Sequence, residues 1–524
     1  MSSTTRLAPQ AGHPTAPGLD ADTGRAAGIG RGRAARGVDA GRWPDVAAVP
    51  RDRGKAAIAR LLLQVVVGRL KIRVQLPDGH LLRDARPGTP IMFLHRPEDF
   101  FRRVGAGGLI GFGESYMAGD WDSDDLAGLL TIMATQIDRL VPRPLQWLRS
   151  LYVARRPADW DADEQGARRN VHRHYDLSND MFALFLDETM TYSSALFETD
   201  DFGAPLPDRG SLNRGWLNRG SLDHGSPEQA ARRLAAAQRR KIDRLLDDTG
   251  VGPGTRVLEI GTGWGELAIR AAARGADVLS VTVSAEQRAL AMQRVAGAGL
   301  SDRVRVELRD YREVTGQFDA IVSVEMIEAV AERYWPDYFR VLDRLLAPGG
   351  RVGLQAITMP HHRMLATRRT KTWILKYIFP GGLIPSITAI EDNVREHTGL
   401  EITRRRDFGP HYARTLQIWR DRFAAAADDL DRLGFDQVFR RMWELYLCYS
   451  EAGFRSGYLQ VSQFVLARAE AAANPDGGPA AELAAAPDGG LAGGGLAGGG
   501  LPGRGLPAAG DEEPDADQDT EVAA

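Results

Sequence analysis

The sequence predicts an α/β protein built on a mainly parallel sheet, with a smaller mixed domain before it and disordered tails at both ends. Strand-like and helix-like segments alternate from about residue 165 to 470, as they do in proteins with parallel sheets. A glycine-rich turn directly follows one of these strands, and both ends of the chain are rich in Gly and Ala. At roughly 150 residues per domain, 524 residues leave room for about two to four domains.

Composition divides the chain into segments. Residues 1–40 are rich in Ala, Gly and Arg and have few large apolar side chains, and residues 471–524 repeat Gly-Gly-Leu-Ala before turning acidic, so both are predicted to be disordered. Near-repeats of Arg-Gly-Ser-Leu mark 203–226 as a loop insertion. The predicted domains are an N-terminal lipid-associated domain at 41–160 and the α/β domain at 165–470.

The elements follow in order along the chain. Residues 71–76 and 90–94 predict strands of the smaller domain, and the helix 228–248 ends before Gly250. The strands of the larger domain are apolar runs between turn signals: Arg256–Ile260, Asp277–Thr282, Val304–Leu308, Phe318–Ser323 and Arg351–Gln355. The predicted helices between them run to Arg274, begin at Ala285, and cover 332–346 before a turn at 348–350.

Charge and cysteine content limit the classes of function. The formal net charge is −3, but ten acids and one base fall in 471–524, which leaves a modestly basic body. That charge suits an anionic phospholipid surface or an ordinary solvated one, and it is too weak and scattered to indicate nucleic acid. The single Cys448 allows no intrachain disulfide, and the apolar run 61–67 is too short to span a bilayer. We expect a cytoplasmic protein, peripheral at the inner membrane face.

The sharpest local motif is the segment 257–265, in which an apolar strand runs into Gly261, Gly263 and Gly265 and then into a helix. Glycines let the backbone turn tightly and approach a ligand, and the helix start offers free N–H groups. The spacing is not the G-x-G-x-x-G of dinucleotide sites, which favours a ligand without phosphates such as S-adenosylmethionine. A glycine turn that only packs a helix on a sheet is the alternative.

Polar residues end the next two strands. Thr282, Ser284 and Gln287 follow the second strand, where a ribose would lie, and Tyr311 and Arg312 follow the third, where an adenine could stack. Ligands of open α/β sheets bind at the carboxyl ends of the strands, so these residues are predicted to share one crevice.

Several motifs together resemble the cyclopropane fatty acid synthase family, which includes the mycolic acid cyclopropane synthases. They are VHRHYDLSNDMF at 171–182, TYSSALF at 191–197, EIGTGWGE at 259–266, SVEMIEAV at 323–330, and the FPGG and PHYARTL segments at 379–382 and 410–416. Residues of about 50–160, with GFGESYMAGDW, resemble the extra N-terminal domain of the phospholipid-acting members. The segments QAITMPHHRM and MWELY are similar to the branch that makes 10-methylene or 10-methyl (tuberculostearic-type) acids.

The resemblance implies a class I methyltransferase that moves a methyl group from S-adenosylmethionine to the cis double bond of an unsaturated acyl chain of phospholipid. The residues that it assigns to the cofactor are Tyr192, Ser193, Glu259, Gly261, Thr262, Gly263, Trp264, Gly265, Thr282, Ser284, Gln287, Tyr311 and Arg312. No metal site is expected. The product is a 10-methylene acid, which would need a separate reductase partner for saturation, or a cyclopropane; the motifs do not separate the two.

The reaction needs a base, and the resemblance implies a bound bicarbonate. The residues assigned to this catalytic site are Ser194, Glu328, Gln355, Ile357 and Tyr412. Ser194 stands where Cys is usual and Gln355 where His is usual; an amide donates a hydrogen bond but cannot relay a proton. We therefore hypothesise that Glu328, oriented by Tyr412, supports proton removal directly or through the anion. His361 or His411 could also substitute for the missing His, although an ordinary polar role is the simpler interpretation of both.

Other aromatic and amphipathic segments are candidates for contact with the acyl chain. Tyr175, Phe379 and Tyr412 could stabilise a carbocation or simply pack in a core. The helix 56–69 could lie on lipid or pack on a neighbouring domain. The segment 371–379, which mixes Lys with Trp, Tyr and Ile, is the preferred site of acyl entry.

Two other functions remain open from the sequence. One is an O- or N-methyltransferase for a small molecule, because fold does not fix function. The other is an inactive lipid-binding homologue. The oligomeric state is not predicted.

Overall fold

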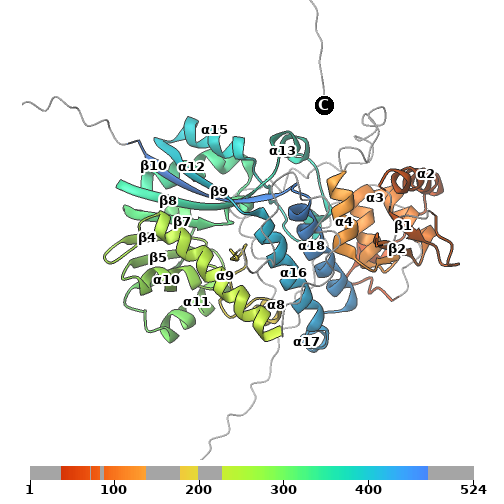
Figure 1. Ribbon diagram of the computed structural model, residues 1–524, viewed down its shortest axis with the longest axis horizontal. Coiled ribbons are helices and arrows are strands. Elements are labelled where there is room, and N and C mark those ends of the chain that lie inside the picture. The colour runs from red at the N-terminus through yellow and green to blue at the C-terminus, as the bar shows by residue number, and fades with distance from the viewer. Residues whose placement is uncertain (1–36, 71, 83–87, 137–177, 199–226, 470–524) are drawn as a thin grey trace, which may run out of the picture. The chain divides into compact units, whose positions relative to one another are not determined.

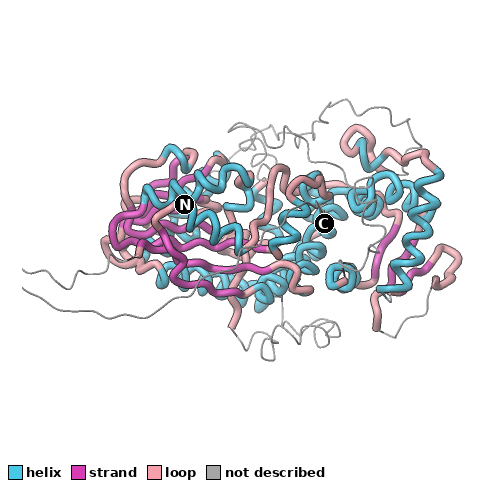
Figure 2. Tube along the Cα trace, turned by 90° about the horizontal axis from the view of Figure 1, so that it is seen from above, coloured by secondary structure: helices cyan, strands magenta, loops and turns pink. Residues whose placement is uncertain are grey.

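The computed structural model describes residues 37–70, 72–82, 88–136, 178–198 and 227–469. The predicted tails, the insertion at 203–226, the boundary near residue 160 and most of the 171–182 motif lie outside these ranges. The predicted fold class is confirmed: helices surround a twisted sheet, and a smaller three-stranded sheet precedes it in the chain (Figures 1 and 2).

The main sheet has seven strands in the order β6-β5-β4-β7-β8-β10-β9. Their bounds are β4 Arg256–Ile260, β5 Asp277–Thr282, β6 Val304–Leu308, β7 Phe318–Val324, β8 Leu346–Thr358, β9 Leu400–Asp407 and β10 Gln460–Arg468. Strands β6 to β8 are parallel, whereas β10 pairs antiparallel with both β8 and β9. The five strands predicted for this domain are confirmed, and the antiparallel edge was not predicted.

The turn predicted at 348–350 lies inside a strand. Strand β8 begins at Leu346, and its pairing with β7 shifts register between the pairs Phe318–Leu346 and Ala320–Arg351. Gly349 has φ +73°, which lets the chain bulge there and return to the same partner strand. The turn signal was correct locally, but pairing continues on both sides of it.

Helices cover both faces of the sheet (Figure 1). Helices α9 (Pro227–Asp248), α10 (Glu266–Ala273) and α11 (Ala285–Gly297) pack on one face, and α12 (Trp335–Leu345) and α15 (Ile387–His397) on the other. Side chains of strand β4 alternate between the two faces. Val257 packs in the core beneath α9, α10 and α11, while Leu258 and Ile260 pack in the core beneath α12 and α15. Alternation therefore turns Glu259 toward the face of α9.

A helical group adds an aromatic core at the end of the sheet. It consists of α8 (Asn179–Phe185), α16 (Gly409–Ala425), α17 (Ala427–Arg432) and α18 (Gln437–Arg455). Two short helices, α13 (His361–Thr367) and α14 (Trp373–Tyr377), follow strand β8 in the chain. The ring centroid of Phe185 lies 6.1 Å from that of Trp419 and 6.1 Å from that of Trp443. This core brings α8, α16 and α18 together.

The smaller sheet has the order β1-β2-β3, with β1 Arg73–Gln75, β2 Ile91–Leu94 and β3 Trp121–Ser123. Its helices are α1 (Pro44–Ala47), α2 (Arg53–Leu70), α3 (Pro97–Met117) and α4 (Leu126–Thr135). Arg441 of α18 donates to the carbonyl of Trp121 at 2.8 Å and stacks 4.0 Å above the ring of Tyr116. These contacts join the N-terminal part to the helical group.

One of the predicted lipid-contact segments, 371–379, packs against other parts of the protein. In α14, Lys376 pairs with Glu114 at 2.5 Å and with Asp45 at 2.7 Å, so its charge is already matched. Trp373 is buried against Gly113, where an added Cβ would lie 2.3 Å from the indole. The charge of Lys376 is therefore matched within the fold and Trp373 is buried, while most other residues of 371–379 are partly exposed. Acyl entry at this segment stays a prediction. None of the helices in the described ranges combines the length and apolar character that crossing a bilayer requires.

Candidate active site

The site lies where the strand order of the sheet reverses. From β4 the chain moves outward to β5 and β6, and it then returns to β7 on the other side of β4. The connections leave β4 and β7 in opposite directions, which opens a crevice at their carboxyl ends. Gly261 follows β4 and Glu325 follows β7, so the two residues meet at this crevice.

The glycine turn is shaped to admit a ligand. Gly261, Gly263 and Gly265 have φ of +94°, +52° and +90°, a region that side chains disfavour. A Cβ added to Gly263 would meet no protein atom within 4 Å, so this residue faces open space, whereas at Gly265 it would lie 3.2 Å from Ala291 Cβ of α11. The sequence left open whether the glycines approach a ligand or only pack a helix on the sheet. Gly263 has the space to approach a ligand, and Gly265 packs against α11.

A cavity of about 190 Å³ opens at this turn. Ten of the residues assigned to the cofactor line it: Tyr192, Ser193, Glu259, Gly261, Thr262, Gly263, Trp264, Thr282, Gln287 and Tyr311. They combine backbone groups, hydroxyls and the rings of Tyr192, Trp264 and Tyr311, and the cations Lys241 and Arg309 line the same cavity. Hydroxyls, backbone groups and aromatic rings fit a ligand with an amino-acid end, a ribose and an adenine.

Three other assigned residues act beside the cavity. Gly265 precedes α10 and packs on α11, and Ser284 Oγ caps α11 by accepting from the N–H of Gln287 at 3.2 Å. Arg312 pairs with Asp310 at 2.7 Å, which holds the turn that carries Tyr311. The structure thus places these residues behind the cavity wall.

Two buried ionisable groups lie behind the cofactor turn. Glu259 accepts a 2.5 Å hydrogen bond from Ser280 Oγ, and burial raises the pKa of its carboxyl to about 8. Lys241 of α9 donates to Ser193 Oγ at 2.6 Å, and burial lowers the pKa of its ammonium to about 8 although nearby carboxylates, Glu325 first among them, oppose the shift. Lys241 was not predicted, because it stands among other basic residues of an amphipathic helix.

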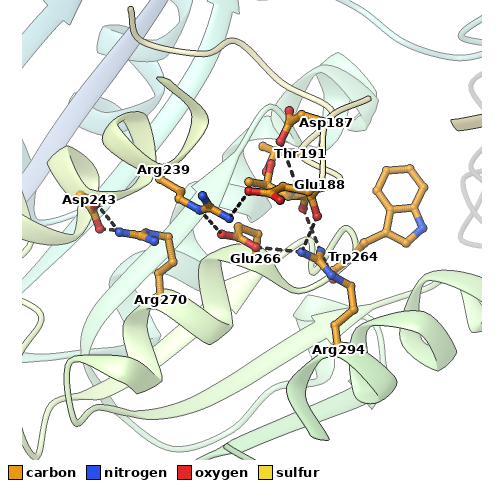
Figure 3. Close-up of polar contacts among 10 residues, drawn as sticks. Asp187, Glu188, Thr191, Arg239, Asp243, Trp264, Glu266, Arg270 and Arg294 are labelled. Atoms are coloured by element: carbon orange, nitrogen blue, oxygen red, sulfur yellow. Dashed lines mark hydrogen bonds and ion pairs between the residues drawn. The ribbon is translucent and has the colours of Figure 1, made fainter. Parts of the chain in front are cut away.

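An arginine fastens the segment that covers the cavity. Arg294 of α11 donates to the carbonyls of Thr189 at 2.8 Å and Trp264 at 2.7 Å, and it pairs with Glu266 at 2.8 Å (Figure 3). Arg239 of α9 reaches Glu188 at 2.8 Å in the same group. These contacts tie residues 188–192, including the cavity-lining Tyr192, to the glycine turn. Arg294 was also missed from the sequence.

Three of the five residues assigned to the bicarbonate site donate hydrogen bonds to a carboxylate of the chain itself, that of Glu325. Glu325 Oε1 accepts from the N–H of Ser194 at 3.0 Å and from Gln355 Nε2 at 2.8 Å. Its Oε2 accepts from the hydroxyl of Tyr412 at 2.7 Å. The prediction that Tyr412 orients Glu328 was therefore wrong, because Tyr412 contacts the glutamate three residues earlier.

Glu328 lies beside this group. Its Oε1 accepts from the N–H of Ile357 at 2.5 Å, and its Oε2 is buried without a hydrogen-bond partner. Burial, with a further contribution from the negative charge of Glu325, raises the pKa of the Glu328 carboxyl to about 8. At neutral pH Glu328 is therefore mainly protonated. Burial raises the pKa of the Glu325 carboxyl as well, and the hydrogen bonds from Tyr412 and Ser194 oppose that rise.

A hydrogen-bonded chain fixes the orientation of Gln355. Its Oε1 accepts from Gln463 Nε2 at 3.0 Å, and Gln463 Oε1 accepts from Arg244 at 2.7 Å. With its oxygen used in this way, Gln355 can offer only its N–H to Glu325. His361 contacts Ser386 at 2.8 Å and His411 accepts from the N–H of Phe197 at 3.0 Å, so both histidines have structural partners elsewhere.

Aromatic side chains line the approach to the acid pair. The hydroxyls of Tyr192 and Tyr446 lie 2.7 Å apart, and Phe379 meets the ring of Tyr446 edge-on at 5.6 Å. Tyr412 stacks on Phe454 with centroids 4.5 Å apart. Tyr175 lies outside the described residues. No cluster of His, Cys, Asp or Glu that could hold a metal ion occurs within the described ranges.

Comparison with known proteins identifies the family. The model described as mycolic acid cyclopropane synthetase matches residues 162–464. The chain belongs to this family. It is 56% identical to tuberculostearic acid methyltransferase UfaA1 of Mycobacterium tuberculosis, over 82% of this chain and 96% of that protein. It is 32% identical to cyclopropane-fatty-acyl-phospholipid synthase of Escherichia coli, over 71% of this chain and 86% of that protein.

Membership of the family makes the chain an S-adenosylmethionine-dependent methyltransferase. Among solved structures, mycolic acid cyclopropane synthase CmaA1 complexed with SAH and CTAB is 30% identical, covers 59% of this chain and 98% of that one, and has a TM-score of 0.48. The matched range 162–464 of this chain contains the glycine turn, both glutamates and the three donors to Glu325.

Proposed function

We propose that this methyltransferase acts on the cis double bond of an unsaturated fatty acyl chain of phospholipid and makes a 10-methylene acid, the precursor of a tuberculostearic-type acid. The observation that carries the proposal is the cavity that places the cofactor turn beside a hydrogen-bonded carboxylate, Glu325. The name of the 56% identical relative supports the methylene product. A cyclopropane is the second candidate, which the name of the E. coli relative supports.

The bound cofactor supplies an electrophilic methyl carbon. The protein must then do three things for a weak nucleophile such as an alkene: hold it in line, exclude water and take up a proton. Tyr192 and Trp264 give the cavity apolar walls, and the segment fastened by Arg294 covers it. No serine, cysteine or lysine needs to act as a nucleophile in this arrangement.

A membrane surface is the proposed source of the substrate. Helix α2 exposes Ile58, Leu61 and Val65, and α3 exposes Leu109, which is 70% exposed. Large apolar side chains gathered on neighbouring helices suit shallow insertion among lipid headgroups. We propose that the protein works as a peripheral protein at the inner membrane face. A separate reductase would then be needed to convert a methylene product into a methyl branch.

Product analysis tests the proposal. The full-length protein is incubated with S-adenosylmethionine and dioleoyl phospholipid vesicles, and the acyl chains are examined by proton NMR. Exocyclic vinyl protons support the methylene product, and upfield ring protons indicate a cyclopropane instead. Methylation of a small polar acceptor with no change in the lipid would contradict the proposal and favour an O- or N-methyltransferase. Cofactor binding without any methyl transfer would favour an inactive lipid-binding homologue.

Bicarbonate is not part of this proposal. Three donors that we assigned to it from the sequence, the N–H of Ser194 and the side chains of Gln355 and Tyr412, already bind Glu325. We therefore propose a base within the chain.

A further inference from the structure

We infer that the carboxylate of Glu325 is the base that removes the proton from the methylated acyl chain, in place of a separate bound anion. This inference rests on the proposed function and names the residue that completes it. It assigns the role to a side chain that the sequence analysis did not single out.

The first support is the hydrogen-bond geometry. An ionised carboxylate offers about four acceptor positions, and the donors from Ser194, Gln355 and Tyr412 fill three of them. They come from three different parts of the chain and fix both oxygens. About one position remains for a proton, and oxygens held by donors in this way are poor nucleophiles toward a carbocation.

The second support is position. Glu325 lines the cavity together with Gly261 and Gly263, whereas Glu328 is not among the residues that line it. Both glutamates are partly exposed, so the lining of the cavity is what distinguishes them. Of the two glutamates, only Glu325 shares this space with the cofactor turn.

The third support is backbone strain. Glu325 has φ +51°, in the left-handed region that residues other than glycine disfavour. Strained residues persist at functional sites where the surroundings hold them. Here the carbonyl of Gln355 accepts from the N–H of Glu325 at 2.8 Å and holds the turn. Glycine would relieve the strain, so the side chain at this position is retained against a local cost.

The fourth support is charge balance. Lys241 is a buried cation whose interactions include Glu325, and Glu328 contributes no second negative charge while it is protonated. The charge of Lys241 and the hydrogen bonds from Tyr412, Ser194 and Gln355 favour the charged form of Glu325. They oppose the rise in the pKa of its carboxyl that burial causes.

The proton transfer balances as follows. Methyl transfer uses the alkene electron pair for the new C–C bond and breaks the S–CH3 bond, whose electron pair stays on the sulfur of the leaving S-adenosylhomocysteine. It leaves a carbocation on the acyl chain. A hydride shift moves the positive charge to the methyl-bearing carbon, and Glu325 then takes one proton from the new methyl group. The C–H electron pair becomes the exocyclic double bond, and the carboxylic acid returns its proton to solvent. Without the hydride shift, the same proton removal closes a cyclopropane.

The test compares Glu325→Gly with Glu325→Gln. Glycine empties the anion position and suits the positive φ, so this variant should fold, whereas glutamine fills the position with a neutral group. Both should retain S-adenosylmethionine binding by calorimetry and should lose product formation by about 100- to 10,000-fold, the range for loss of a general base. Added formate or bicarbonate should restore part of the activity of Glu325→Gly only.

A readout independent of turnover accompanies this test. Formate should raise the Tm of cofactor-free Glu325→Gly, because the emptied donors bind it, and should leave the Tm of the wild type and of Glu325→Gln unchanged. Wild-type activity should not change when carbon dioxide is stripped from the buffer. Wild-type activity that needs added bicarbonate, or near-normal turnover by Glu325→Gln, would overturn the inference.

Different results would contradict the proposed function and the assignment of the base. If the wild type leaves every unsaturated phospholipid unmodified, the proposed function fails, whatever the variants do. If the wild type makes the lipid product and Glu325→Gln makes it equally well, only the assignment of the base fails.

Discussion

Adding one methyl group to the glycine turn should separate cofactor binding from stability. Gly263→Ala places a Cβ where no protein atom lies within 4 Å, in the space that lines the cavity. The backbone strain at φ +52° should cost about 1–2 kcal/mol of stability. The methyl group in the cofactor's space should cost a further 1–3 kcal/mol of binding, by the typical cost of overpacking, or about a 5- to 150-fold rise in Kd.

Two other glycines supply matched controls. Gly299 follows α11 with φ +71° and open space around it, so Gly299→Ala should lose similar stability and retain the wild-type Kd. Gly265→Ala would press against Ala291 at 3.2 Å and should lose more stability than either. Calorimetry measures the Kd for S-adenosylmethionine, and urea unfolding measures stability. If Gly263→Ala binds the cofactor as tightly as Gly299→Ala does, the turn does not contact the cofactor and the reasoning fails.

Three further predictions concern buried charge and the cover of the cavity. Arg294→Ala should raise the Kd for S-adenosylmethionine and increase amide exchange at residues 188–192, because it removes the donors that hold this segment; unchanged exchange would contradict the role. Asp120→Ala should lower the free energy of unfolding by about 3–5 kcal/mol, because it strands Arg103, whose side chain is 1% exposed; a loss below 1 kcal/mol by urea unfolding would show that the pair is not buried in solution. Burial raises the pKa of the Glu259 carboxyl from 4.5 to about 8, so between these pH values the folded state binds more protons than the unfolded state. The contribution of this carboxyl to stability therefore falls as pH rises from 4.5 to about 8. In Glu259→Gln that part of the pH dependence of the free energy of unfolding should vanish, and a pH profile identical to that of the wild type would refute the shift.

The sequence by itself determined the five parallel strands of the main sheet and the cofactor turn, but not the antiparallel strands β9 and β10. Strands such as β4 and β5 begin and end at the predicted residues because their apolar runs are bounded by local turn signals. The glycines at 261, 263 and 265 were recognisable because a tight approach to a ligand requires glycine at those positions. Most of the cofactor-lining residues then followed, since parallel strands end at the same edge of a sheet.

Only the tertiary structure decided which acid is held by the donors around the site. Glu325 and Glu328 stand three residues apart in one segment, and nothing local distinguishes them. Tyr412 and Ser194 are 87 and 131 residues away from Glu325 in the chain, so their choice of partner depends on how α16 and the segment after α8 pack. The same holds for Lys376 and Arg294, whose charges looked free in the sequence and are matched by residues brought near through folding. Hydrogen bonds over such separations depend on packing geometry, and a local sequence pattern does not contain that geometry.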